Sequence, residues 1–118
     1  MKQFIKLRIK SVRYVLKGMF LLLSSESAIK AQTFIFLIFV GIGLYCKISL
    51  LDWALQFFCY GLVLTAESLN TAIEKICDYI QPEFDKKIGF IKDISAGAVG
   101  FAAFFSAIVT FLIYYKYI

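Results

Sequence analysis

Four polar residues along one predicted helix are the residues of this chain best suited to chemistry. They are Glu67, Asn70, Glu74 and Asp78, which we call the polar stripe. At about 100° per residue these positions fall within an arc of about 80°, so on a helix they share one face. Fourteen residues without a charge, 53–66, come directly before Glu67. If this run crosses a membrane, Glu67 lies inside the apolar layer, where an ionisable side chain is costly and usually functional.

A simpler interpretation is a helix that leaves a membrane with its charges in water. Solvation alone, however, requires neither a single face nor an asparagine between two glutamates. The chain has no histidine, which excludes histidine acid–base catalysis and leaves carboxylates as the candidate proton acceptors. Its three cysteines stand apart in apolar segments, without the paired spacing of a zinc or redox site, and we expect core thiols.

The composition predicts a small integral membrane protein. Of 118 residues, 61% are hydrophobic and 18% aromatic, well above the usual apolar content of a soluble domain. We expect an all-α fold in a single domain, 1–118: an amphipathic surface helix followed by three transmembrane helices.

The surface helix is predicted at about 2–24. Five basic residues share an arc of about 80° on this helix, opposite an apolar face, although Arg8 interrupts the apolar side. They are Lys2, Lys6, Lys10, Arg13 and Lys17. This pattern is typical of a helix that lies on an anionic membrane surface. A cleaved signal peptide is the weaker alternative, because the apolar run 19–23 is short and polar residues follow it directly.

Three apolar runs predict the membrane spans, at about 31–47, 51–80 and 93–115. Pro82 is expected to end the second helix, and residues 83–92 are expected to form a charged loop.

Small residues mark two further places where helices are expected to approach a neighbour. Gly41 and Gly43 in the first span either soften the helix or admit another one. The third span carries a row of small residues at helical spacing, which predicts close packing either within the chain or between copies. The row consists of Ala96, Gly100, Ala103 and Ala107.

The positions of the charges predict the orientation. With three spans, eleven of the 13 lysines and arginines lie on the side of the N-terminal segment, which marks that side as cytoplasmic. Lipid head groups account for the net charge of +5, so we expect no nucleic-acid partner. Seven of the 8 acidic residues lie on the same side, and carboxylates among lysines suit a divalent cation with bound phosphate. These seven are Glu26, Glu67, Glu74, Asp78, Glu83, Asp85 and Asp93.

Two motifs resemble the prokaryotic diacylglycerol kinase family, which includes the undecaprenol kinases. They are Ala66–Asp78 and Lys92–Val99, and Lys17-Gly18 and Glu26 before the first span add to the likeness. The resemblance covers nearly the whole chain. It implies a homotrimeric, multi-pass enzyme of the bacterial inner (cytoplasmic) membrane that acts in lipid metabolism and phospholipid biosynthesis. Such an enzyme transfers the γ-phosphate of ATP to a lipid alcohol, with Mg²⁺ as cofactor and its active site on the cytoplasmic side.

The same resemblance implies roles for individual residues. Glu67 resembles the general base, and Glu26 and Glu74 resemble the carboxylates that bind Mg-ATP. Asn70 and Ala96 correspond to positions at the lipid-hydroxyl site. The remaining residues implied to line the nucleotide are Tyr14, Asp78, Glu83, Asp85, Lys92 and Asp93.

Three positions depart from the best-known pattern of the family. They are Leu16 where some members have tryptophan, Gln32, and Ala96 where diacylglycerol-specific members often have serine. All three positions are ones where lipid would be contacted, so the acceptor stays open between diacylglycerol, which we place first, and undecaprenol. A different class of function is a non-catalytic or proton-conducting small membrane subunit.

Overall fold

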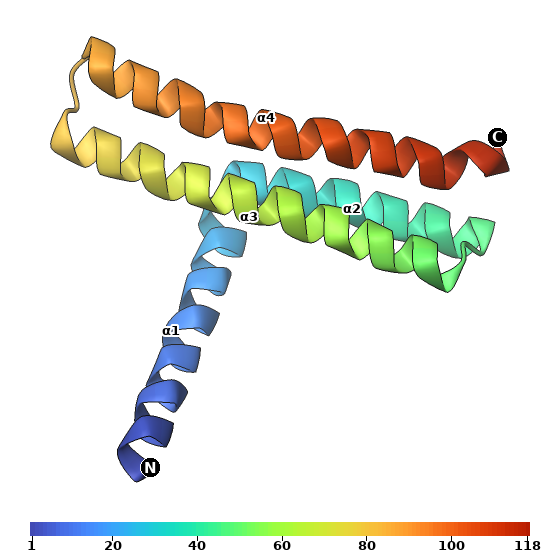
Figure 1. The fold of residues 1–118 in the computed structure, drawn as a ribbon, viewed down its shortest axis with the longest axis horizontal. Coiled ribbons are helices and arrows are strands. Elements are labelled where there is room, and N and C mark those ends of the chain that lie inside the picture. The colour runs from blue at the N-terminus through green and yellow to red at the C-terminus, as the bar shows by residue number, and fades with distance from the viewer.

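The computed structural model describes residues 1–118, and all of its regular elements are helices (Figure 1). Three of them pack side by side: α2 (Ser27–Cys46), α3 (Leu50–Ile80) and α4 (Lys86–Tyr114). Helix α3 lies between the other two in sequence and packs against both. The first helix, α1 (Lys2–Ser25), projects away from this layer, and a short 3₁₀ turn, η1 (Tyr115–Tyr117), follows α4.

Local capping explains where the central helices begin and end. Lys47 adopts a left-handed conformation with φ 54° directly after α2. Ser49 caps α3 by accepting a hydrogen bond from the backbone N–H of Asp52 at 3.2 Å. Helix α3 ends at Ile80 because Pro82 disfavours the helical conformation of the residue before it, Gln81.

The prediction of a charged loop at residues 83–92 is wrong for most of these residues. Helix α4 already begins at Lys86, so the connection between α3 and α4 ends at Asp85. The carboxylate of Asp85 accepts hydrogen bonds from the backbone N–H groups of Lys87 and Ile88, at 2.9 and 3.2 Å. This cap satisfies two free N–H groups at the helix start and lets α4 include the charged residues up to Asp93.

Two helical segments are long and apolar enough to cross a membrane, Ser27–Cys46 and Lys86–Tyr117. Only 11% of the most apolar stretch of each is buried within the chain, whereas the core helix of a soluble protein is mostly covered. Their apolar faces therefore need lipid or another protein surface. Helix α3 is not one of these segments, because polar residues such as Asp52, Gln56 and Glu67 interrupt its apolar sequence.

Helix α1 makes little contact with the rest of the chain. It has no buried residue, and within the chain it contacts mainly α2. The radius of gyration, 17.9 Å, exceeds the value of about 13–14 Å expected for a compact chain of this length. The apolar side of α1, including Phe4, Ile9 and Val12, is therefore left exposed.

Gly43 allows α2 and α3 to pack closely. A Cβ atom at this position would lie 2.9 Å from Cη2 of Trp53 and 3.1 Å from Cδ1 of Ile48. Gly41, two residues earlier, faces open space. The two predicted roles of these glycines were to soften the helix or to admit another one. Gly43 has the second role, because α3 packs against it.

The first half of the row of small residues on α4 does not pack within the chain, whereas Ala103 and Ala107 line a cavity between α2, α3 and α4. Ala96 and Gly100 are exposed, and a Cβ on Gly100 would meet no atom. The residues of α4 that are buried are Ser95, Ala102, Ser106 and Ile113. For Ala96 and Gly100, contact between copies therefore stays the prediction.

Candidate active site

The polar stripe runs along the second half of α3, and its first two residues are less exposed than its last two. Glu67 and Asn70 are half-buried, whereas Glu74 and Asp78 are exposed. Nδ2 of Asn70 donates a hydrogen bond to Oε1 of Glu74 at 3.1 Å. Glu67 takes part in none of the ion pairs of the chain. Its half-buried carboxylate is therefore not engaged by a cation within the chain.

Asp78 and Lys92 connect the lower end of the stripe to α4. Their side chains form a charge-assisted hydrogen bond between the two helices. Because α4 begins at Lys86, Lys92 is held on a rigid helix and not on a loop. The ammonium group therefore has a fixed place near the exposed end of the stripe.

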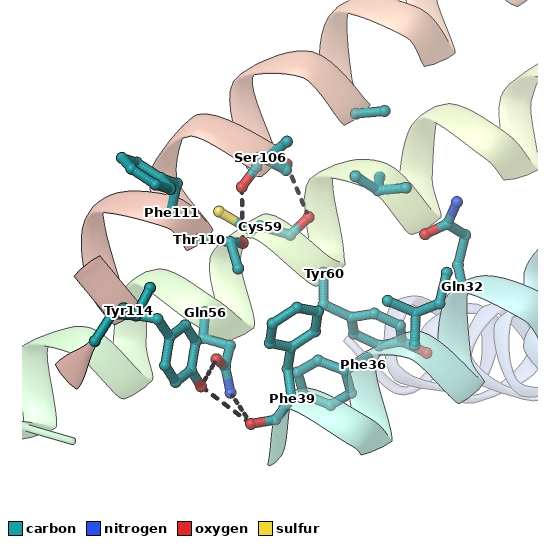
Figure 2. A pocket seen from close by; sticks show the side chains of 15 residues that line it. Gln32, Phe36, Phe39, Gln56, Cys59, Tyr60, Ser106, Thr110, Phe111 and Tyr114 are labelled. Atoms are coloured by element: carbon teal, nitrogen blue, oxygen red, sulfur yellow. Dashed lines mark hydrogen bonds between the residues drawn. The ribbon is translucent and has the colours of Figure 1, made fainter. Parts of the chain in front are cut away.

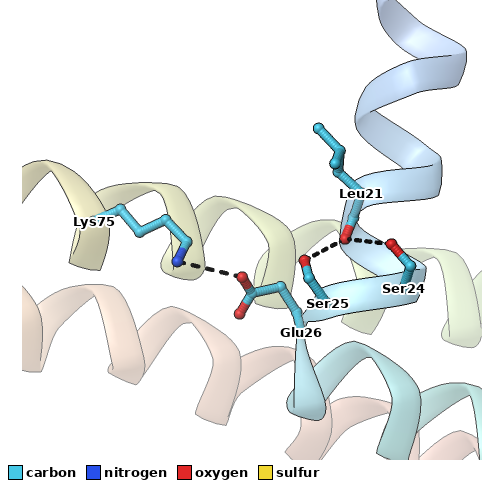
Figure 3. Close-up of polar contacts among 5 residues, drawn as sticks. All are labelled: Leu21, Ser24, Ser25, Glu26 and Lys75. Carbon is cyan, nitrogen blue, oxygen red and sulfur yellow. Dashed lines mark hydrogen bonds and ion pairs between the residues drawn. The ribbon is translucent and has the colours of Figure 1, made fainter.

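Glu26 lies at the break between α1 and α2, where its backbone is extended (φ −98°, ψ 119°). Its Oε1 lies 3.4 Å from Nζ of Lys75 on α3 (Figure 3). The hydroxyls of Ser24 and Ser25 donate hydrogen bonds to the carbonyl oxygen of Leu21 in the last turns of α1. Lys75 was not among the predicted site residues. No local sequence signal marks it, because its pairing with Glu26 depends on how α3 packs beside the junction of α1 and α2.

Glu26 and Glu74 have separate partners within one chain, Lys75 and Asn70 respectively. No group of three or more cysteine, aspartate or glutamate side chains lies close enough to hold a metal ion. The type of donor nevertheless suits Mg²⁺, which prefers oxygen ligands and is commonly held by one or two carboxylates with water and substrate phosphates. One chain thus supplies suitable ligands but no complete metal cage.

The other predicted site residues are dispersed. Tyr14 is exposed on the projecting helix α1. Glu83 and Asp85 belong to the connection before α4, where Asp85 is engaged as its cap. Asp93 and Ala96 are exposed on α4. Of the predicted residues outside the stripe, only Lys92 is in hydrogen-bond contact with it.

A mostly apolar cavity of about 470 Å³ lies between α2, α3 and α4, away from the polar stripe (Figure 2). At one end the hydroxyl of Tyr114 donates to Oε1 of Gln56 and lies 3.0 Å from the carbonyl oxygen of Phe39. These groups satisfy one another, so they link α2, α3 and α4 at this end of the cavity. The sequence pattern did not predict this network, although Gln56 stands out as a polar residue in an apolar run.

Comparison with known proteins identifies the class. Residues 13–114 match the model of the family described as prokaryotic diacylglycerol kinase, so the chain belongs to that family and the predicted resemblance is confirmed. The chain is also similar to an undecaprenol kinase of Bacillus subtilis (strain 168), with 35% identity over 72 residues. This match covers 61% of the present chain and 58% of the relative, a little over half of that protein's length.

Proposed function

We propose that this protein is a lipid kinase that transfers the γ-phosphate of ATP to the hydroxyl of a membrane lipid alcohol, with Mg²⁺ as cofactor. The observation that carries the proposal is the polar stripe. It combines a free, half-buried carboxylate at Glu67 with the hydrogen-bonded pair Asn70–Glu74, inside the residues matched by the kinase family.

In this proposal Glu67 is the general base. Seven residues separate it from Glu74, about 10 Å along a helix axis. Glu67 can therefore lie at the depth of a lipid hydroxyl in the membrane, while Glu74 lies nearer water. Glu67 takes the proton of the lipid hydroxyl as its oxygen attacks the γ-phosphorus of ATP. ADP leaves with the electron pair of the broken bond. Phosphoryl transfer needs mainly positioning and charge neutralisation, and the remaining groups supply these.

Glu26 and Glu74 would hold Mg²⁺ together with the nucleotide phosphates. The metal ion would neutralise charge on the transferring phosphoryl group. Lys92, positioned by Asp78, adds a fixed positive charge. We assign Tyr14, Glu83, Asp85 and Asp93 to the nucleotide side of the site.

We further propose three spans, a surface helix and a homotrimer in the bacterial inner membrane, with the site facing the cytoplasm. Eleven of the 13 basic residues lie on one side of such an arrangement. The uncovered apolar faces of α1, α2 and α4 support contacts with lipid and with other copies. The separate partners of Glu26 and Glu74 support a site that is completed between copies.

Undecaprenol is the acceptor that we now place first. The name of the Bacillus relative favours it, and so does alanine at position 96 in the Ser-Ala-Gly-Ala segment. The family's description favours diacylglycerol, whose product would be phosphatidic acid. Both acceptors present a primary hydroxyl at the membrane surface, so they call for the same chemistry at Glu67.

The test uses purified protein in detergent micelles with [γ-³²P]ATP, Mg²⁺ and either undecaprenol or diacylglycerol. We expect label in undecaprenyl phosphate, and loss of label when Mg²⁺ is chelated. Label only in phosphatidic acid would overturn the choice of acceptor but keep the kinase. Folded protein that labels neither lipid would overturn the kinase. A proton leak in liposomes containing such inactive protein would then support the proton-conducting alternative.

A further inference from the structure

Two buried polar atoms on the facing helices α3 and α4 have no hydrogen-bond partner within the chain. They are Oδ1 of Asn70 and Oγ of Ser95. A third such atom, Oδ2 of Asp52, lies 2.8 Å from Nζ of Lys116, so an ion pair satisfies it. Ser95 as a whole is only 8% exposed. Buried polar groups are nearly always paired, so each exception requires an explanation.

The packing of α3 against α4 brings these two residues to a similar level. Asp78 pairs with Lys92, and the hydroxyl of Ser106 donates to the carbonyl oxygen of Cys59 at 3.5 Å, which fixes an antiparallel register. Ser95 lies three residues beyond Lys92, about 4.5 Å along the axis. Counted from Lys92, Ser95 lies near the level of Glu74, and counted back eleven residues from Ser106 it lies near the level of Asn70, so the two residues are within about one helical turn of each other.

The hydrogen-bonding capacity of the two groups restricts what they can bind. The carboxylate of Glu74 only accepts hydrogen bonds, so the NH₂ group of Asn70 must face it and Oδ1 must face the other way. Oδ1 accepts only, so its partner must be a donor. The hydroxyl of Ser95 both donates and accepts. Ionised phosphate oxygens accept only and leave Asn70 unsatisfied, whereas an alcohol hydroxyl satisfies both groups.

We propose that Ser95 and Asn70 together bind the hydroxyl of the acceptor lipid. Ser95 donates to the oxygen of that hydroxyl, and Oδ1 of Asn70 accepts its hydrogen before transfer. Glu67 lies one turn further along α3, where it can take the proton. The inference rests on the proposed lipid kinase and adds to it a binding residue, Ser95, in place of its exposed neighbour Ala96.

The test is Ser95→Ala in the full-length protein. We expect the apparent KM for the lipid alcohol to rise about five- to tenfold, the effect of one lost hydrogen bond, with the KM for ATP unchanged. The melting temperature should stay the same or rise, because an unpaired buried hydroxyl is removed. In the absence of nucleotide, undecaprenol should raise the melting temperature of the wild type more than that of the variant.

Ser106→Ala is the matched control. Ser106 is a buried serine on the same helix, but its hydroxyl has a partner in the carbonyl oxygen of Cys59. We expect this variant to melt at a lower temperature with an unchanged KM for lipid.

Two results would overturn the role of Ser95. One is a lower melting temperature for Ser95→Ala with an unchanged lipid KM, as for a serine that only stabilises the fold. The other is an increase in the KM for ATP alone. If the wild type phosphorylates neither lipid alcohol, the proposed function fails. The lipid-induced change in melting temperature then still tests hydroxyl binding by itself.

Discussion

Nζ of Lys75 lies 3.4 Å from Oε1 of Glu26, and this ion pair joins the junction of α1 and α2 to α3. The side chain of Lys75 is 70% exposed, whereas that of Glu26 is 25% exposed. Such exposed pairs contribute at most about 1 kcal/mol to stability. The pair therefore keeps the Glu26 carboxylate beside α3 without binding it strongly enough to prevent its exchange for another cation.

The first prediction concerns this carboxylate and that of Glu74. Glu26→Gln and Glu74→Gln should each raise the apparent KM for ATP, because an interaction made in the ground state is lost. Excess Mg²⁺ should restore part of the activity. Steady-state kinetics at varied ATP and Mg²⁺ concentrations measure both effects.

Asp52→Asn is the control for these variants. Asp52 is an ion-paired acid at the opposite end of α3, joined to Lys116, so its loss should lower stability and leave the ATP and Mg²⁺ dependence unchanged. Unchanged nucleotide and metal dependence in both glutamine variants would remove Glu26 and Glu74 from the metal site.

A second prediction compares two glycines of α2. Gly41→Ala and Gly43→Ala gain the same helix propensity, about 1 kcal/mol. Only the alanine at position 43 would meet the indole of Trp53, at 2.9 Å, and overpacking of this kind typically costs about 1–3 kcal/mol. Gly43→Ala should therefore melt at a lower temperature than Gly41→Ala. Equal melting temperatures would mean that Trp53 moves aside without penalty.

Sequence patterns were sufficient for the features set by local periodicity. The amphipathic pattern of the first 24 residues, the apolar runs and Pro82 each predict a helix or its end from a few neighbouring residues. The polar stripe needed only helical spacing, since its four members lie on one helix.

The rest depends on contacts between residues distant in sequence. The pairing of Lys75 with Glu26 and of Asp78 with Lys92 requires the register between helices. The missing partner of Ser95 becomes visible only when its neighbours are in place. The start of α4 was misjudged because its charged residues suggested a loop, whereas Asp85 acts as a cap.

The third prediction concerns assembly. Gly100→Leu should lower both oligomer content and activity, because Gly100 is exposed within one chain and belongs to the row of small residues on α4. Phe101→Leu changes an adjacent exposed apolar residue and should affect neither. Crosslinking and size-exclusion chromatography with light scattering report the oligomer. Full activity in a demonstrably monomeric protein is incompatible with a site shared between copies.

The last prediction concerns Glu67, the half-buried carboxylate that has no ion-pair partner. Glu67→Gln keeps the size and polarity of the side chain but removes the proton acceptor. If Glu67 takes the proton of the lipid hydroxyl, kcat should fall by about 10²-fold or more while Mg-ATP binding changes little. Turnover and nucleotide affinity must be measured on the same preparation.

A structural role for Glu67 makes a different prediction. The glutamine variant would then stay active, or would lose activity only in proportion to lost folding or oligomer. Melting temperature and oligomer content, compared with those of the wild type, separate this outcome from lost chemistry. A folded and assembled Glu67→Gln variant with near-normal kcat would show that the proton leaves by another route, because no amide side chain can replace a carboxylate as a base at neutral pH.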